Sequence, residues 1–127
     1  MKFAKRFISV LVFVMMLSSA AFALSDAEYH RMKKHSKSFA EADRRLNRVW
    51  HEIRDDMPEI QFNILHSEQK DWIDSGRDRE ARRYIKRGYS KTEAYTKATN
   101  ERVNKLRERS RELMRPKTKP EHKHRRK

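Results

Sequence analysis

Apolar residues recur at seven-residue steps in the segment that begins at residue 25. The residues of this series are Met32, Phe39, Leu46 and Ile53, joined by Ala42 and Val49. The spacing resembles the a and d positions of a heptad and predicts an amphipathic helix. A capping box, Ser25-Asp26-Ala27-Glu28, marks its start, and Pro58 disfavours helical geometry in the residue before it. We therefore expect a single helix from Ser25 to about Met57.

A second helix is expected to begin at Pro58, a residue suited to the first helical turn. Its apolar residues are Ile60, Ile64, Leu65, Trp72 and Ile73. Gly76 interrupts or kinks this helix, and Asp78 is placed to cap a continuation from Arg79 to Arg87. Gly88 follows at the position where many helices end in a left-handed residue.

A third helix is predicted from a second capping box, Ser90-Lys91-Thr92-Glu93, to about Met114, before Pro116. The chain contains no alternating strand pattern and no Asn-Gly or Asp-Gly hairpin pair. The predicted fold class is therefore all-α, a small elongated bundle of three to four antiparallel helices. The pattern leaves open whether the seven-residue series packs within one chain or against a second copy.

The N-terminus has the three parts of a secretory signal peptide in the right order. Its positive region is formed by Lys2, Lys5 and Arg6. Residues 7–17 are almost wholly apolar, and Ala21 and Ala23 supply the small residues of a cleavage site. The apolar run is shorter than the roughly 18 residues that a spanning helix needs. We expect cleavage after Ala23, export to the periplasm or the extracellular space, and no transmembrane segment in the mature form.

The net charge of +14 is distributed unevenly. Without the signal peptide +11 remains, of which +6 lies in residues 115–127 and +5 in residues 24–114. The seven cations of this tail are Arg115, Lys117, Lys119, Lys123, Arg125, Arg126 and Lys127. The tail has no apolar residue to bury, so we expect it to be disordered and to contact an anionic surface. The alternative is that the tail only increases solubility and has no dedicated partner. Because we expect the protein to be exported, we do not expect nucleic acid as a partner.

Residues spread over the three predicted helices match a known pattern. They are Leu46, Trp50, Gln69, Trp72, Arg77, Asp78, Thr99, Arg102 and Leu106. With them the chain resembles the lysozyme-inhibitor LprI-like N-terminal domain over roughly residues 36–110. The most specific parts are Gln69-x-x-Trp72 followed by Arg77-Asp78, and the later Thr99-x-x-Arg102-x3-Leu106. The resemblance implies a small exported helical bacterial domain that acts by protein–protein contact and, as the family name indicates, includes inhibitors of lysozyme.

The chain departs from the family pattern in two places. Family members usually carry paired cysteines after the Arg-Asp segment and before the late threonine. This chain has no cysteine and holds Ala81 and Ala94 or Tyr95 there, so the rigidity of the loop between the second and third helices is in question. Gly76 also looks inserted, because Arg77 follows Trp72 by five residues where the family pattern has four.

No arrangement typical of catalysis is present in the sequence. It contains no Gly-rich phosphate loop, no nucleophile elbow and no His-Glu-x-x-His motif. Cysteine is absent, and His122-x-His124 is too sparse for a closed metal site. We therefore expect neither an enzyme nor a cofactor or metal. Two interpretations stay open for the group formed by Gln69, Trp72 and Arg77. It is either a packed structural group or an exposed recognition patch.

Two function classes remain. The first is an exported envelope binding protein of the LprI-like type that acts by protein–protein contact. Lysozyme inhibition is one such role, but a mature charge of +11 repels basic lysozymes at long range. The acidic residues Asp71, Asp74 and Asp78 offer a local docking patch. The alternative is a periplasmic helical protein that associates with polyanions or a membrane surface, including in a chaperone-like role.

Overall fold

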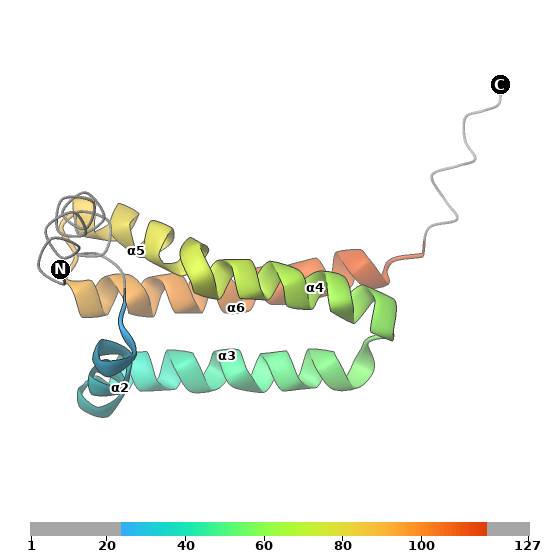
Figure 1. Ribbon diagram of the computed structural model, residues 1–127, viewed down its shortest axis with the longest axis horizontal. Helices are drawn as coiled ribbons and strands as arrows, with labels where there is room; N and C mark the ends of the chain where they lie inside the picture. The colour runs from blue at the N-terminus through green and yellow to red at the C-terminus, as the bar shows by residue number, and fades with distance from the viewer. Residues whose placement is uncertain (1–23, 117–127) are drawn as a thin grey trace, which may run out of the picture.

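The computed structural model describes residues 24–116 and places most of them in helices (Figure 1). The elements are α2 (Asp26–His35), α3 (Lys37–Asp56), α4 (Glu59–Asp71), the π-helical segment η1 (Trp72–Gly76), α5 (Arg77–Lys86) and α6 (Lys91–Met114). Residues 24–116 contain no strand, so the predicted all-α fold class is confirmed. The predicted signal peptide and residues 117–127 of the predicted disordered tail, which begins at Arg115, lie outside the described residues.

Three long helical rods lie along the bundle, and each runs antiparallel to the one before it in the chain (Figure 1). The first rod is α3, and the second is the run of α4, η1 and α5. The third is α6, which packs against both of the others. The short α2 lies out of line with α3 at the N-terminal end of that helix (Figure 1). The bundle is therefore elongated, as the sequence predicted.

The predicted single helix from Ser25 to Met57 is wrong, because the chain breaks at Ser36. Ser36 has an extended backbone (φ −119°, ψ 113°), and its side chain caps α3 by accepting a hydrogen bond from the Phe39 amide. Its own amide donates to the Met32 carbonyl at 2.8 Å and closes α2. A serine hydroxyl competes in this way with continued helix. The break lets Tyr29 pack edge-on against Phe39, with ring centroids 5.8 Å apart.

Gly76 marks a π-helical turn rather than an interruption. The Arg77 amide donates to the Trp72 carbonyl, five residues back, so the turn takes up one residue more than an α-helical turn. A Cβ atom at Gly76 would lie 3.0 Å from Trp72 Cδ1, so glycine permits the close approach to the indole. The predicted cap at Asp78 is wrong, because the helical backbone runs on through Gly76 and α5 begins at Arg77 without a side-chain cap.

Other local predictions are confirmed. Both capping boxes form, at Ser25–Glu28 and at Ser90–Glu93. Gly88 adopts a positive φ of 103° after α5, a conformation that costs glycine little. The last helix ends at Met114. Each of these features depends on atoms within one helical turn.

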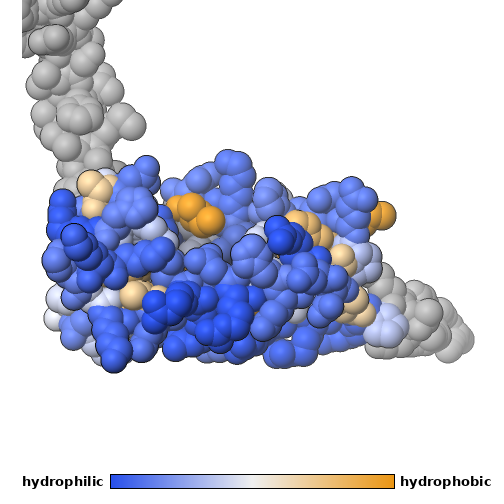
Figure 2. Space-filling view, turned by 90° about the horizontal axis from the view of Figure 1, so that it is seen from below, coloured by the Kyte–Doolittle hydropathy of each residue, from blue (hydrophilic) through white to orange (hydrophobic). Residues whose placement is uncertain are grey.

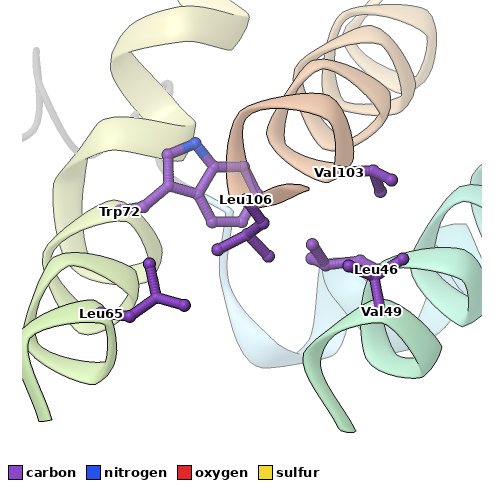
Figure 3. Packing of buried hydrophobic residues seen from close by; sticks show 6 residues of the cluster. All are labelled: Leu46, Val49, Leu65, Trp72, Val103 and Leu106. Carbon is purple, nitrogen blue, oxygen red and sulfur yellow. The ribbon is translucent and has the colours of Figure 1, made fainter. Parts of the chain in front are cut away.

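Two apolar clusters fill the interior, and α6 contributes to both. The first cluster, shown in Figure 3, consists of Leu46, Val49, Leu65, Trp72, Val103 and Leu106. The second consists of Met32, Phe39, Ala81, Ala94 and Tyr95. The seven-residue series of α2 and α3 thus packs within the chain. Ala81, Ala94 and Tyr95, the positions at which the resemblance predicts paired cysteines, are fully buried in this cluster.

The outer face seen in Figure 2 is largely hydrophilic, with only isolated apolar side chains. The large apolar residues that stay exposed are Ile60, Ile64, Ile73 and Met114. Three of these belong to the second predicted helix, in which Leu65 and Trp72 are the buried apolar residues. Within residues 24–116, no helix is both long and apolar enough to cross a membrane.

Candidate functional site

A groove of about 610 Å³ lies where α4 and η1 face α2 and α3. Aromatic and apolar side chains form much of its wall. Its lining residues are Leu24, Asp26, Tyr29, Asp43, Leu46, Asn47, Trp50, His66, Gln69, Lys70, Trp72, Ile73 and Arg77. Five of the nine family-pattern residues are among them, namely Leu46, Trp50, Gln69, Trp72 and Arg77. The groove is therefore the place where most of the pattern residues meet.

The groove exists because α4 is attached to α6 rather than closely packed on α3. Arg109 of α6 forms a two-pronged ion pair with Glu68, in which Nη2 lies 2.7 Å from Oε2 and Nε lies 2.9 Å from Oε1. One heptad earlier on α6, the Nε atom of Arg102 donates to Oε1 of Gln69 at 2.7 Å. These two arginines hold α4 against α6, and His66, Gln69 and Lys70 of α4 line the groove.

Trp50 bridges α3 and α4 at the groove. Its ring lies 5.1 Å from the Phe62 ring and 6.0 Å from the His66 ring, measured between centroids. Trp50 and Phe62 are half-buried, whereas His66 is exposed. The indole therefore packs between the helices and still presents part of its surface to the groove.

Trp72 is buried where α4, η1, α5 and α6 meet. Its Nε1 donates to Oε1 of Glu80 at 3.3 Å. The guanidinium carbons of Arg77 and Arg102 lie 5.9 Å and 5.7 Å from the centre of the indole. Burial lowers the pKa of Arg102, and the negative charges of Glu80 and Glu68 act in the opposite direction. These contacts make Trp72 an interhelical packing residue with one edge in the groove.

Arg77 and Asp78 adjoin in the sequence but have different partners. The guanidinium of Arg77 lies 6.0 Å from the Tyr29 ring as well as beside Trp72. Its Nε atom is buried and has no hydrogen-bond partner among the described residues. Asp78 instead accepts hydrogen bonds from the Tyr95 hydroxyl and the Leu24 amide. Arg77 thus faces the groove, and Asp78 ties α5 to α6 and to the start of α2.

The proposed acidic docking patch is divided in the structure. Asp71 and Asp74 are exposed, and Asp74 lies 3.4 Å from the Nζ atom of Lys70. Asp78 is half-buried and uses one oxygen for bonds within the bundle. Burial and the Asp78 carboxylate raise the pKa of the Tyr95 phenol above its usual range. Asp78 therefore serves the fold, and only the two exposed carboxylates can contribute to an acidic surface.

A polar pair in the groove wall was missed from the sequence. Tyr29 of α2 donates its hydroxyl to Oδ2 of Asp43 on α3 at 2.7 Å, and the Nζ atom of Lys33 lies 3.4 Å from the same oxygen. Asp43 is buried. Burial, followed by Asp43 itself, raises the pKa of Tyr29 above its usual range. One indication in the sequence that Asp43 is buried was its place directly after Ala42, a member of the seven-residue series.

The remaining pattern residues have structural positions. The buried hydroxyl of Thr99 donates to the Tyr95 carbonyl at 2.7 Å. Leu46 and Leu106 belong to the first apolar cluster. Arg115, the first tail cation, is exposed at the end of α6. The other six tail cations lie outside the described residues.

Comparison with known proteins adds no assignment. No family model matches the chain, and neither the curated proteins nor the solved structures give a match. Among residues 24–116, no three or more His, Asp or Glu side chains are grouped so that they could hold a metal ion. The LprI-like resemblance therefore stays a prediction, and the groove is the feature from which function can be argued.

Proposed function

We propose that this chain is an exported envelope binding protein rather than an enzyme, and that it holds a segment of a partner protein in the groove. The observation that carries the proposal is a cavity of about 610 Å³ lined by Tyr29, Trp50 and Trp72. Ile73 lies at the same groove with 46% of its surface exposed. Concave sites with aromatic walls and a few polar groups are typical of recognition.

The groove lining holds two cations, Lys70 and Arg77, and two carboxylates, Asp26 and Asp43, of which Lys70 and Asp43 already have ion-pair partners. Arg77 is the groove residue that favours a partner segment with carboxylates. Arg77 contributes a buried Nε atom that lacks a hydrogen-bond partner among residues 24–116. A guanidinium pairs well with a carboxylate, which accepts two parallel hydrogen bonds. The chain from Leu24 onward carries +11, which attracts acidic partners at long range. The expected ligand is therefore a peptide segment with an apolar or aromatic anchor flanked by Asp or Glu.

The LprI-like resemblance supports a protein as the partner, because five of its nine residues line the groove. Lysozyme is the partner that the family name suggests. Basic lysozymes are repelled by the positive charge of this chain, so we expect no inhibition of them. An activity assay of a basic lysozyme, with and without the protein starting at Leu24, tests this. Inhibition at micromolar concentration would show that local contacts outweigh the repulsion.

The two tryptophans of the chain both line the groove, so their fluorescence reports on its occupancy. A suitable probe is a synthetic peptide with a central Phe flanked by Asp and Glu. The matched peptide carries Lys in place of each acid. We expect a saturable change in tryptophan emission with the acidic peptide and none with the basic one. No saturable change with either peptide contradicts the proposal.

Two exposed isoleucines provide a matched pair of variants. Ile73→Asp places a carboxylate at the groove and should weaken acidic-peptide binding at least about tenfold, a loss of 1.4 kcal/mol or more. Ile60→Asp makes the same change at a residue that is 74% exposed and lies outside the groove lining. Both variants should fold, because neither side chain is buried. Equal losses in the two variants would argue against the groove as the binding site.

Association with an anionic surface is the second candidate, and the surface of α5 favours it. Arg79, Arg83 and Lys86 are exposed on this helix, and Arg87 is exposed at its end. The end of α5 lies at the opposite end of the bundle from the point where the chain leaves α6 (Figure 1). Cations for such an association are therefore present on α5, in addition to those of the tail sequence.

Sedimentation with vesicles of phosphatidylglycerol and phosphatidylcholine tests this second candidate. Binding should weaken with salt, because exposed charges are screened. Truncation after Pro116 and the double change Arg83→Glu with Lys86→Glu should each reduce binding. Binding that is insensitive to salt, or that survives both changes together, rules out a surface role for these cations.

A further inference from the structure

The backbone nitrogen of Leu24 lies 3.2 Å from Oδ1 of Asp78, 54 residues further along the chain. The bond joins the residue before the cap of α2 to the first turn of α5. The side chain of Leu24 is half-buried against the apolar cluster that contains Phe39 and Tyr95. The nitrogen is therefore held in a defined place beside a carboxylate rather than at a frayed end.

The residues that follow Leu24 are tied down as well. Ser25 caps α2, and Glu28 completes its capping box. Glu28 also forms an ion pair with Lys91 of α6, with 2.9 Å between Oε2 and Nζ. This ion pair lowers the pKa of Glu28. The start of α2 is thus fixed to α5 through Asp78 and to α6 through Lys91, so the position of the Leu24 nitrogen is set by three elements.

Cleavage after Ala23, as the sequence predicts, changes the chemistry of this nitrogen. Hydrolysis of the Ala23–Leu24 peptide bond consumes one water and leaves a carboxylate on Ala23 and an amine on Leu24. The amine takes up a proton at neutral pH, since α-amino groups have pKa values of about 7.7–8.0. A neutral amide donor to Asp78 thereby becomes a cationic donor. The bond to the Asp78 carboxylate then gains the attraction between two opposite unit charges, which the neutral amide lacks.

We propose that Asp78 is the binding site of the new α-ammonium group, and that signal-peptide removal completes the packing of α2 on α5 and α6. The proposal rests on the predicted cleavage site and is independent of the partner bound in the groove. It also gives a role to the carboxylates near the start of α2. A positive charge at a helix N-terminus opposes the helix dipole, and Asp26, Glu28 and Asp78 offset it.

Chains that differ only before Leu24 test the proposal. One begins at Leu24 with a free amine, a second is acetylated on that amine, and a third carries Gly-Ser before Leu24. The free-amine chain should melt about 4–8 °C above the other two, the shift expected for roughly 1 kcal/mol in a domain of this size. Equal melting temperatures in the three chains overturn the proposal.

Asp78→Asn is then introduced into each of the three chains. All of them should lose stability, because Tyr95 also donates to Asp78, but the advantage of the free amine should disappear. Asp74→Asn is the matched control, an exposed carboxylate paired with Lys70, and should leave the advantage intact. An advantage that survives Asp78→Asn, or that is lost in Asp74→Asn, contradicts the proposed site. So does N-terminal sequencing of the exported protein that shows a start other than Leu24.

Discussion

Arg102 on α6 and Gln69 on α4 are joined by a 2.7 Å hydrogen bond between Nε and Oε1, although 33 residues separate them. The guanidinium of Arg102 also lies 5.7 Å from the centre of the Trp72 ring. The two most specific parts of the family-like pattern, Gln-x-x-Trp and Thr-x-x-Arg, therefore meet across a helix interface. The residues of these two parts form a packed contact between α4 and α6, and this contact positions one wall of the groove.

Arg102→Met should lower the free energy of unfolding by about 1.5–3 kcal/mol, the contribution typical of hydrogen bonds to charged groups. The change keeps the apolar stem against Trp72 and removes the donor to Gln69. Urea unfolding followed by circular dichroism measures it. Lys105→Met is the control on the same helix, since Lys105 is exposed, and should change stability by less than about 0.5 kcal/mol.

A double-mutant cycle measures how far the two side chains depend on each other. It needs Gln69→Ala alone and Gln69→Ala combined with Arg102→Met. We expect the double change to cost less than the sum of the single changes, with a coupling of about 0.5–3 kcal/mol. Additive costs would mean that the two side chains do not depend on each other. That result would remove the physical reason for linking the two parts of the pattern.

Gly76→Ala should destabilise the protein by about 1–3 kcal/mol, because the new methyl group would lie 3.0 Å from Trp72 Cδ1 and overpack the site. In an ordinary helix interior the same change stabilises by roughly 0.5–1 kcal/mol. The two expectations differ in sign, so a thermal melt decides between them. A stabilised variant would show that Trp72 can shift freely. A change in tryptophan emission should accompany the loss.

Features that depend on one helical turn could be predicted from the sequence. The hydroxyls of Ser25 and Ser90 each bind an amide three residues later, so their neighbours suffice to identify them. Gly88 ends α5 for a similar reason, since its positive φ is a local property. Gly76 was predicted to be an inserted residue only by comparison with the family pattern, and it lies in a π-helical turn, a geometry that takes up one residue more than an α-helical turn.

Features that depend on distant residues could not be predicted. The groove arises from the attachment of α4 to α6 and the position of α2, and neither leaves a pattern in one segment. Tyr29 and Asp43 meet only because the chain breaks between them at Ser36. That break did have a local signal, the Ser36 hydroxyl three residues before Phe39. The seven-residue series continues from Met32 to Phe39 across Ser36, and for this reason the sequence pattern predicted one uninterrupted helix.

Tyr29→Phe should lower the free energy of unfolding by about 1–3 kcal/mol, because it leaves the buried carboxylate of Asp43 without its closest donor. Lys33 remains at 3.4 Å and limits the loss. Tyr89→Phe is the matched control, since it keeps a ring beside Lys97 and removes a hydroxyl from a half-buried position. Equal effects in chemical denaturation would show that the Tyr29 hydroxyl contributes nothing specific.

Tyr84 gives the bundle a pH dependence in alkaline solution. Its hydroxyl donates to Oε2 of Glu101, and this bond, followed by burial, raises the pKa of Tyr84 from 10.0 to about 12. The folded state therefore holds the phenol proton more tightly than the unfolded state does. The resulting stabilisation is fully present below pH 10 and is lost as the pH rises through about 12. Tyr29 and Tyr95 are raised in the same direction and add to this loss.

Tyr84→Phe should therefore flatten part of the decline in unfolding free energy between pH 10 and about pH 12, while Tyr29 and Tyr95 account for the rest. The measurement is urea unfolding at a series of pH values, combined with phenolate absorbance to follow the titration of each variant. Glu101→Gln is the matched control, because it keeps an acceptor for the Tyr84 hydroxyl but removes the negative charge. It should lower the pKa of Tyr84 towards its ordinary value. An unchanged alkaline slope in both variants would show that the Tyr84–Glu101 bond does not hold the phenol proton in solution.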